Sequence, residues 1–167
     1  MSKTISVNKS VAINKKSPLT ERLASELISL YAGGHGKIFS TLQYLDCYFN
    51  FYRLGDYETA STLFQIIVAE MEHTSLLINA LKDIGYTKRE LQNLIRSNEF
   101  YYSTERAKKQ TPRAILLDQL ICEMSCLKEY KRATKKIKEP KILAMLNQII
   151  ADEESHVQII NKLLEKR

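Results

Sequence analysis

Apolar residues recur in steps of three and four along most of the chain, the spacing of an amphipathic helix that buries one face. The first stripe begins at Ser17-Pro18, an N-cap residue followed by a first-turn proline, and ends around Leu54-Gly55. A second stripe begins at or soon after Asp56 and ends at Gly85. Because no strand-type alternation competes with this pattern, we predict two long helices joined by a short turn.

The second half of the chain repeats this arrangement after a long connection. The predicted elements are a short helix over 88–95 with a Thr87–Glu90 capping box, a crossover connection over 96–110, a helix from Thr111-Pro112 to Glu139, and a helix from Pro140 onward. Four long helices, two short turns and one long connection predict an all-α fold, a four-helix bundle with one long crossover connection.

Composition and charge narrow the class of protein. The chain has 167 residues, 44% of them hydrophobic, which is enough for one domain with its own core. Its net charge is +6, and residues 1–16 contribute four lysines and no acid, so we divide the chain into a basic N-terminal arm, 1–16, and the bundle, 17–167. Three cysteines without a CxxC pair argue against a disulfide framework or a zinc ribbon. No apolar run reaches the ~18 to 20 residues that cross a bilayer, so we expect a cytoplasmic protein without a membrane span.

Two of the apolar stripes are interrupted by the same polar pattern. Glu70 and His73 on one helix, and Glu153 and His156 on another, stand three residues apart and therefore share a helical face. A buried carboxylate costs free energy unless it is paired or bound to a metal ion. One such pair is common by chance on a helix surface, but two on apolar stripes indicate either a metal ion or a polar network in the core.

The two short turns add a test of which residues lie level with these pairs. In antiparallel helices, residues at equal distances from a tight turn face each other, so a turn near 138 places Glu123 level with Glu153. A turn near 54 places position 37 or 38 level with Glu70, and position 37, which completes the first stripe, is Lys37. A lysine in the middle of a bundle and opposite acids is expected to pair with them.

These motifs together resemble the ferritin-like superfamily, in particular its rubrerythrin and manganese-catalase branches and their small bacterial, spore-coat-associated relatives. The segments that carry the resemblance are, in order, LYAGGHGKIFSTLQY, VAEMEHTSLLINALKDIG, ICEMSCLKEY and IIADEESHVQI, within about residues 20–165. It implies a ferritin-like four-helix bundle with Glu70 and Glu153 as bridging carboxylates, His73 and His156 as terminal imidazoles, and Glu123 as a terminal carboxylate. Lys37 stands where that group has its remaining terminal Glu.

Lys37 changes the charge of the expected site. Four carboxylates would match two divalent ions, whereas three carboxylates and one ammonium leave a net charge of −2. Repulsion between an ammonium and a nearby metal cation is on the order of 4 kcal/mol even at an effective dielectric of about 20. We therefore predict one ion held by Glu70, Glu123, Glu153 and His156, or no ion and a Lys37 paired with Glu70 and Glu153.

Two alternatives would keep a site for two ions: a neutral Lys37 amine that ligates, or a Lys37 side chain that swings out and is replaced by water. The mixed carboxylate and imidazole ligands suit iron and manganese equally. If two ions bind, the resemblance implies an oxidoreductase acting on a small oxidant, peroxide or dioxygen, with Lys37, Tyr44 and Tyr130 beside the reacting groups.

A different class of function is a structural or binding module whose metal site has degenerated. Such a module could serve in spore-coat-like packaging, and the bundle could form a homodimer through an apolar face. Basic clusters at 1–16, 106–113 and 128–141 also suggest nucleic acid as a partner. Charge runs are usually solvated helix faces, however, and no motif supports specific readout, so we rank nucleic-acid binding below the other functions.

Overall fold

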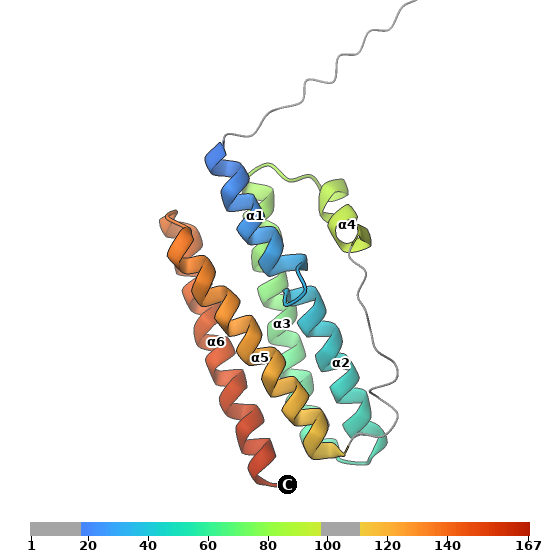
Figure 1. Cartoon of the computed structure of the whole chain (residues 1–167). Coiled ribbons are helices and arrows are strands. Elements are labelled where there is room, and N and C mark those ends of the chain that lie inside the picture. The colour runs from blue at the N-terminus through green and yellow to red at the C-terminus, as the bar shows by residue number, and fades with distance from the viewer. Residues whose placement is uncertain (1–17, 98–110) are drawn as a thin grey trace, which may run out of the picture.

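The computed structural model describes residues 18–97 and 111–167, and within these ranges the regular structure is entirely helical (Figure 1). Its helices are α1 Pro18–Ala32, α2 Lys37–Arg53, α3 Tyr57–Asp83, α4 Lys88–Ser97, α5 Pro112–Lys136 and α6 Pro140–Glu165. None of the helices in the described ranges is long and apolar enough to cross a membrane. The predicted basic arm, 1–16, lies outside the described residues.

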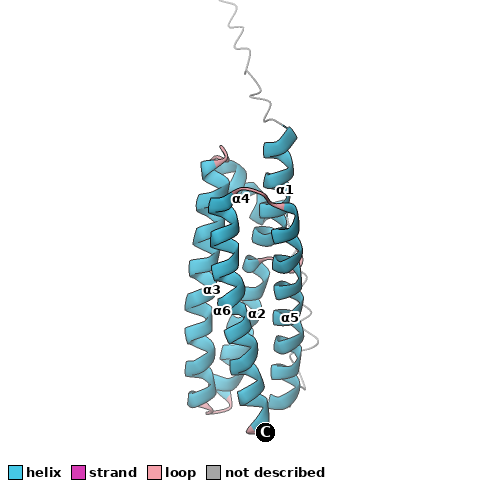
Figure 2. Ribbon diagram, turned by 90° about the vertical axis from the view of Figure 1, so that its left-hand side faces the viewer, coloured by secondary structure: helices cyan, strands magenta, loops and turns pink. Residues whose placement is uncertain are grey.

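Four helical columns run side by side along one axis (Figures 1 and 2). The helices α1 and α2 follow each other end to end in one column, and α3, α5 and α6 form the other three. Because α3 ends beside α4 while α5 begins at the opposite end of the bundle, α3 and α5 run parallel, as a crossover connection requires. Of that predicted connection, 96–110, residues 98–110 lie outside the described residues.

The helix ends follow from capping residues that the sequence displays. Asp56 accepts a hydrogen bond from the backbone N–H of Thr59 at 3.1 Å at the start of α3. Thr111 does the same for α5, accepting from Ala114 N at 3.2 Å, and prolines occupy the first turns of α5 and α6. The predicted capping box forms at α4, which continues to Ser97 rather than ending at 95.

The prediction of one continuous helix from 17 to 54 is wrong at its centre, because the chain turns at 33–36 between α1 and α2. The turn is tight: Gly33 N donates to Ser29 O at 3.0 Å, and Gly36 N donates to Gly33 O at 2.8 Å. A Cβ on Gly36 would lie 2.7–2.9 Å from backbone atoms of residues 31–33, so the turn requires a residue without a side chain there. As a result, Lys37 begins a new helix with its side chain buried.

Two apolar clusters fill the bundle and leave a polar layer between them. In α3, for example, Leu63 and Ile66 belong to one cluster, Leu77 and Leu81 to the other, and Glu70 lies between them. The same order recurs in α5, and α6, which runs in the opposite direction, has it in reverse. Burial of both clusters holds the four helices in register, so the polar side chains are brought together at one depth.

Candidate metal centre

The polar layer contains every charged residue that the sequence predicted for the site. These side chains are between 0% and 5% exposed, and they are Lys37 from α2, Glu70 and His73 from α3, Glu123 from α5, and Glu153 and His156 from α6. The predicted tyrosines Tyr44 and Tyr130 are fully buried beside them. Burial of this many ionisable groups requires that they neutralise one another or bind an ion.

Lys37 lies at the centre of the layer and contacts the two carboxylates that were expected to bridge metal ions. Its Nζ atom is 2.8 and 2.7 Å from the two oxygens of Glu70 and 2.6 Å from Oε1 of Glu153. This is the pairing predicted for the metal-free state. Burial opposes the ammonium charge, but Glu70 and the other anions nearby hold the pKa of Lys37 well above its usual range. A neutral amine is therefore disfavoured in this arrangement.

Four side chains converge closely enough to hold a metal ion. One donor atom each from Glu70, Glu123, Glu153 and His156 lies within 4.8 Å of the other three. Among the described residues, Glu123 Oε2, Glu153 Oε2 and His156 Nδ1 are buried without a hydrogen-bond partner. When both carboxyl groups are ionised, these atoms are orphaned acceptors that cost free energy, and a cation would satisfy them, so these residues fit the ligand set of one carboxylate and imidazole metal site.

His73 lies beside these four donors and contacts two carboxylates of α6. Its Nε2 atom is 3.0 Å from Oδ2 of Asp152, and its Nδ1 atom is 3.1 Å from Oε1 of Glu153. Burial lowers the pKa of His73, but hydrogen bonds to Glu153, Glu70 and Asp152 outweigh it and raise the pKa to about 9. His73 therefore acts here as a second cation rather than as one of the four converging donors.

Asp152 is a contact that the sequence analysis did not predict. Its side chain is 48% exposed, yet one carboxylate oxygen reaches the imidazole of His73. The sequence shows that Asp152 stands next to Glu153, but it does not show that His73 of α3 lies opposite Asp152.

The two tyrosines are held in different ways. The hydroxyl of Tyr44 donates a hydrogen bond to Oε1 of Glu123, and its ring meets the imidazole of His156 edge-on, with centroids 6.5 Å apart. The ring of Tyr130 lies 5.5 Å from Lys37 Nζ, and its buried hydroxyl has no hydrogen-bond partner among the described residues. Burial is the main cause that raises the pKa of both phenols well above their usual range, so both are neutral.

The carboxylates differ in charge because their neighbours differ. Burial disfavours the Glu70 anion, but the ammonium of Lys37 and the two imidazoles hold the pKa of Glu70 well below its usual range. Burial and the neighbouring Glu153 and Glu70 raise the pKa of Glu123 well above its usual range. Without a metal ion, Glu123 is thus the carboxyl group that keeps its proton in the layer and donates it to Glu153, and a bound cation would take the place of that proton.

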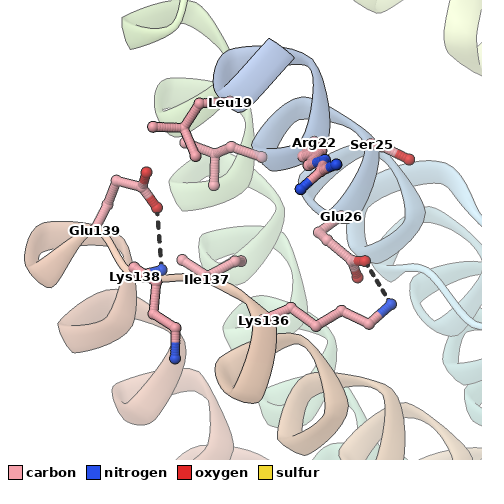
Figure 3. A pocket seen from close by; sticks show the side chains of 9 residues that line it. Leu19, Arg22, Ser25, Glu26, Lys136, Ile137, Lys138 and Glu139 are labelled. Atoms are coloured by element: carbon pink, nitrogen blue, oxygen red, sulfur yellow. Dashed lines mark hydrogen bonds and ion pairs between the residues drawn. The ribbon is translucent and has the colours of Figure 1, made fainter.

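Outside the layer, one surface pocket of about 560 Å³ opens between α1 and the turn that joins α5 and α6 (Figure 3). It is lined by apolar side chains such as Leu23 and Ile137 and by charged ones such as Arg22 and Lys138. Glu26 at its edge is held by Lys136 at 2.8 Å. None of the predicted site residues lines this pocket, so it is separate from the buried centre.

The described helices form a four-helix bundle of ferritin-like fold, with a carboxylate and imidazole cluster in its core. Among solved structures, the chain is similar to two crystal structures of KatB, a manganese catalase from Anabaena, each with a TM-score of 0.67 and 15% sequence identity. The match covers 98% of this chain and 80% of the KatB chain. Neither a protein-family profile nor a curated protein sequence matches the chain.

Proposed function

We propose that this protein binds one manganese or iron ion per chain, through Glu70, Glu123, Glu153 and His156. The observation that carries the proposal is the convergence of these four donors within 4.8 Å while Lys37 Nζ lies 2.6–2.8 Å from Glu70 and Glu153. The buried and unpartnered oxygens of Glu123 and Glu153 support it further.

Lys37 limits the site to one ion. Its ammonium engages both oxygens of Glu70 and one of Glu153, the carboxylates that would otherwise be shared between two ions. The positive charge of Lys37 takes the place of the charge of a second metal ion. It would repel such an ion by an energy on the order of 4 kcal/mol. Lys37 makes its hydrogen bonds to Glu70 and Glu153, so Glu123 and His156 keep donors for the first ion, with His156 Nδ1 3.4 Å from Oε1 of Glu70 and 3.8 Å from Oε1 of Glu123.

A bound manganese or iron ion would supply redox and Lewis-acid chemistry toward a small oxidant such as peroxide or dioxygen. KatB, which has the same fold, is named a manganese catalase. In this chain, the hydroxyl of Tyr44 orients Glu123 by donating to one of its oxygens, and the ring of Tyr44 packs against the imidazole of His156. Tyr44 thus positions two of the proposed ligands, and Tyr130 shields the ammonium of Lys37 from water.

The proposal is tested by metal stoichiometry. Wild-type protein, the Lys37→Glu variant and a Lys131→Glu control are loaded anaerobically with Mn(II) or Fe(II) and desalted, and the ions per chain are measured by elemental analysis. Lys131 is a matched control because it pairs with Glu154 on the surface, where both side chains are about half exposed. We expect one ion in the wild type and the control, and two in Lys37→Glu. Two ions in the wild type would refute the role of Lys37.

A second candidate function, a structural module without metal, is supported by one observation. Glu70 and Glu153 already have charged partners in Lys37 and His73, so the layer is largely neutralised by its own side chains. Absence of bound metal in both the wild type and Lys37→Glu would favour this module. One ion in the wild type, followed by peroxide turnover that depends on it, would favour a redox enzyme.

A further inference from the structure

The surface pocket between α1 and the turn that joins α5 and α6 has the size of a small-molecule site. Its volume of about 560 Å³ falls within the roughly 300–1,000 Å³ that is usual for ligand pockets. Two segments that are far apart in the sequence form its walls, one within 19–26 of α1 and the other within 136–139, at the end of α5 and in the turn. A molecule bound in the pocket would therefore contact both segments.

The floor of the pocket is apolar and is part of the packed core. Leu23 and Ile137 line it, and both are buried members of the apolar cluster at this end of the bundle. Leu19 is 66% exposed and stands at the rim, on the α1 side of the pocket, opposite the turn (Figure 3). Core packing thus fixes the positions of the two floor residues before any ligand binds, which lowers the entropic cost of binding an apolar group there.

The carboxylate of Glu26, at the edge of the pocket, is already neutralised by two cations. Its Oε1 atom is 2.8 Å from Nζ of Lys136, and its Oε2 atom is 2.9 Å from a terminal guanidinium nitrogen of Arg132. The side chain of Glu26 is only 17% exposed, so these ion pairs are partly shielded from water. Glu26 therefore leaves the remaining cations of the pocket without an acid to pair with.

Arg22 is the pocket cation that remains without a partner on the α1 side. Within residues 18–97 and 111–167, its guanidinium makes no hydrogen bond and no ion pair. Lys138 extends away from α1, and the carboxylate of Glu139 accepts a hydrogen bond from the backbone N–H of Lys138 at 3.2 Å (Figure 3). With Arg132 included, four positive side chains meet two negative ones at this pocket. The pocket is therefore electropositive, and Arg22 is free to bind an anion.

We propose that this pocket binds a small organic carboxylate with an apolar body. The guanidinium of Arg22 binds the carboxylate, for which its planar set of N–H donors is suited. The apolar body covers Leu23 and Ile137 on the floor. A neutral molecule would leave Arg22 unpaired and a short anion would leave the floor uncovered, so the pocket selects for both features together. None of the four converging donors of the metal centre lines the pocket, so the proposal does not depend on the metal site.

The experiment is titration calorimetry on the full chain with three probes. They are octanoate, 1-octanol, which has the same chain without the charge, and butyrate, which has the charge on a shorter chain. We expect octanoate to bind, and the other two probes to bind at least ~10-fold more weakly. Arg22→Gln should weaken octanoate binding by about 10-fold and leave the affinity for 1-octanol unchanged. Arg53→Gln is the matched control, because Arg53 is exposed at the end of α2, at the opposite end of the bundle, and it should bind octanoate as the wild type does.

A fluorescence measurement locates the bound probe independently of the Arg22 variant. The chain has no tryptophan, so Leu19→Trp places one fluorophore at the rim, and Ile121→Trp places one on α5 outside the pocket, at a position that is 63% exposed. We expect octanoate to shift the emission of Leu19→Trp to shorter wavelength and to leave that of Ile121→Trp unchanged. The proposal would be overturned by a wild type that does not bind octanoate, by equal affinities for octanoate and 1-octanol, by equal losses in Arg22→Gln and Arg53→Gln, or by a shift in Ile121→Trp alone.

Discussion

Lys37 is the residue on which the polar layer depends. It is 1% exposed and carries the positive charge that Glu70 and Glu153, both fully buried, face directly. Removal of one partner from a buried ion pair leaves an uncompensated charge, which costs far more than the pair contributes to stability. The identity of this one residue therefore decides both the metal content that we propose and the stability of the metal-free core.

We predict that Lys37→Met lowers the free energy of unfolding by about 3–5 kcal/mol in metal-free protein. The measurement is urea unfolding in the presence of a chelator, followed by circular dichroism. Lys131→Met is the control, because it removes a lysine from an ion pair that is about half exposed and should cost less than about 1 kcal/mol. Similar small losses in both variants would show that Glu70 and Glu153 do not need the ammonium.

At the scale of the elements, the turn at 33–36 determines where α2 begins. Lys37 is therefore the first residue of α2, and its Nζ atom lies 2.8 Å from Oε1 of Glu70. Cys126 of α5 also contacts the turn, donating from Sγ to the carbonyl of His35 at 3.3 Å. His35 itself lies in the turn and not among the four converging donors.

We predict that Gly36→Ala destabilises the protein by about 1–3 kcal/mol, because its Cβ would overlap backbone atoms that cannot move aside. Gly34→Ala is the matched control, since a Cβ at Gly34 meets nothing within 4 Å. That substitution should be neutral, or stabilising by up to about 1 kcal/mol, because it restricts the unfolded chain. Thermal unfolding of both variants measures the difference, and equal effects would contradict the role of Gly36.

At the scale of the whole molecule, the C-terminus is tied to the turn that joins α2 and α3. Arg167 pairs with Asp56 and also donates to Thr59 Oγ1 at 2.7 Å, and Lys166 Nζ lies 2.8 Å from Glu58. These contacts join α6 to the start of α3 across the end of the bundle. Burial raises the pKa of Asp56, but hydrogen bonds from Arg167 and Thr59 outweigh it, and the net pKa is lowered.

We predict that Asp56→Ala lowers stability at pH 7 by about 1–2 kcal/mol, through loss of the helix cap and of the Arg167 pair. Because the folded pKa is depressed, this contribution is present above the unfolded value near 3.9 and is lost as pH falls through the folded value. Unfolding measured from pH 7 to acid should show the two proteins converge. Asp83→Ala, which removes a more exposed pair with Lys141, should change stability by less than about 1 kcal/mol.

The sequence by itself determined the helical class, most helix ends, the polar residues of the core and the opposition of Lys37 to Glu70. These properties follow from capping and turn residues and from the 3.6-residue period of a helix. Both assign a residue to a helix face and to a position along the bundle without information about the other helices. The helix ends at Asp56, Gly85, Thr111 and Pro140 are of this kind, since each depends on its own few residues.

Only the tertiary structure decided what depends on distances between helices. The apolar stripe over residues 17–54 keeps its helical spacing through 33–36, so the sequence pattern does not reveal the turn. The geometry of the turn depends on the close approach of backbone atoms at Gly36. Likewise, His73 contacts Asp152 as well as Glu153, and the apolar residues of α2 and α3 adjoin across two helices. A single helix period specifies which face a side chain occupies, but the partner it meets is set by how that helix packs against the others.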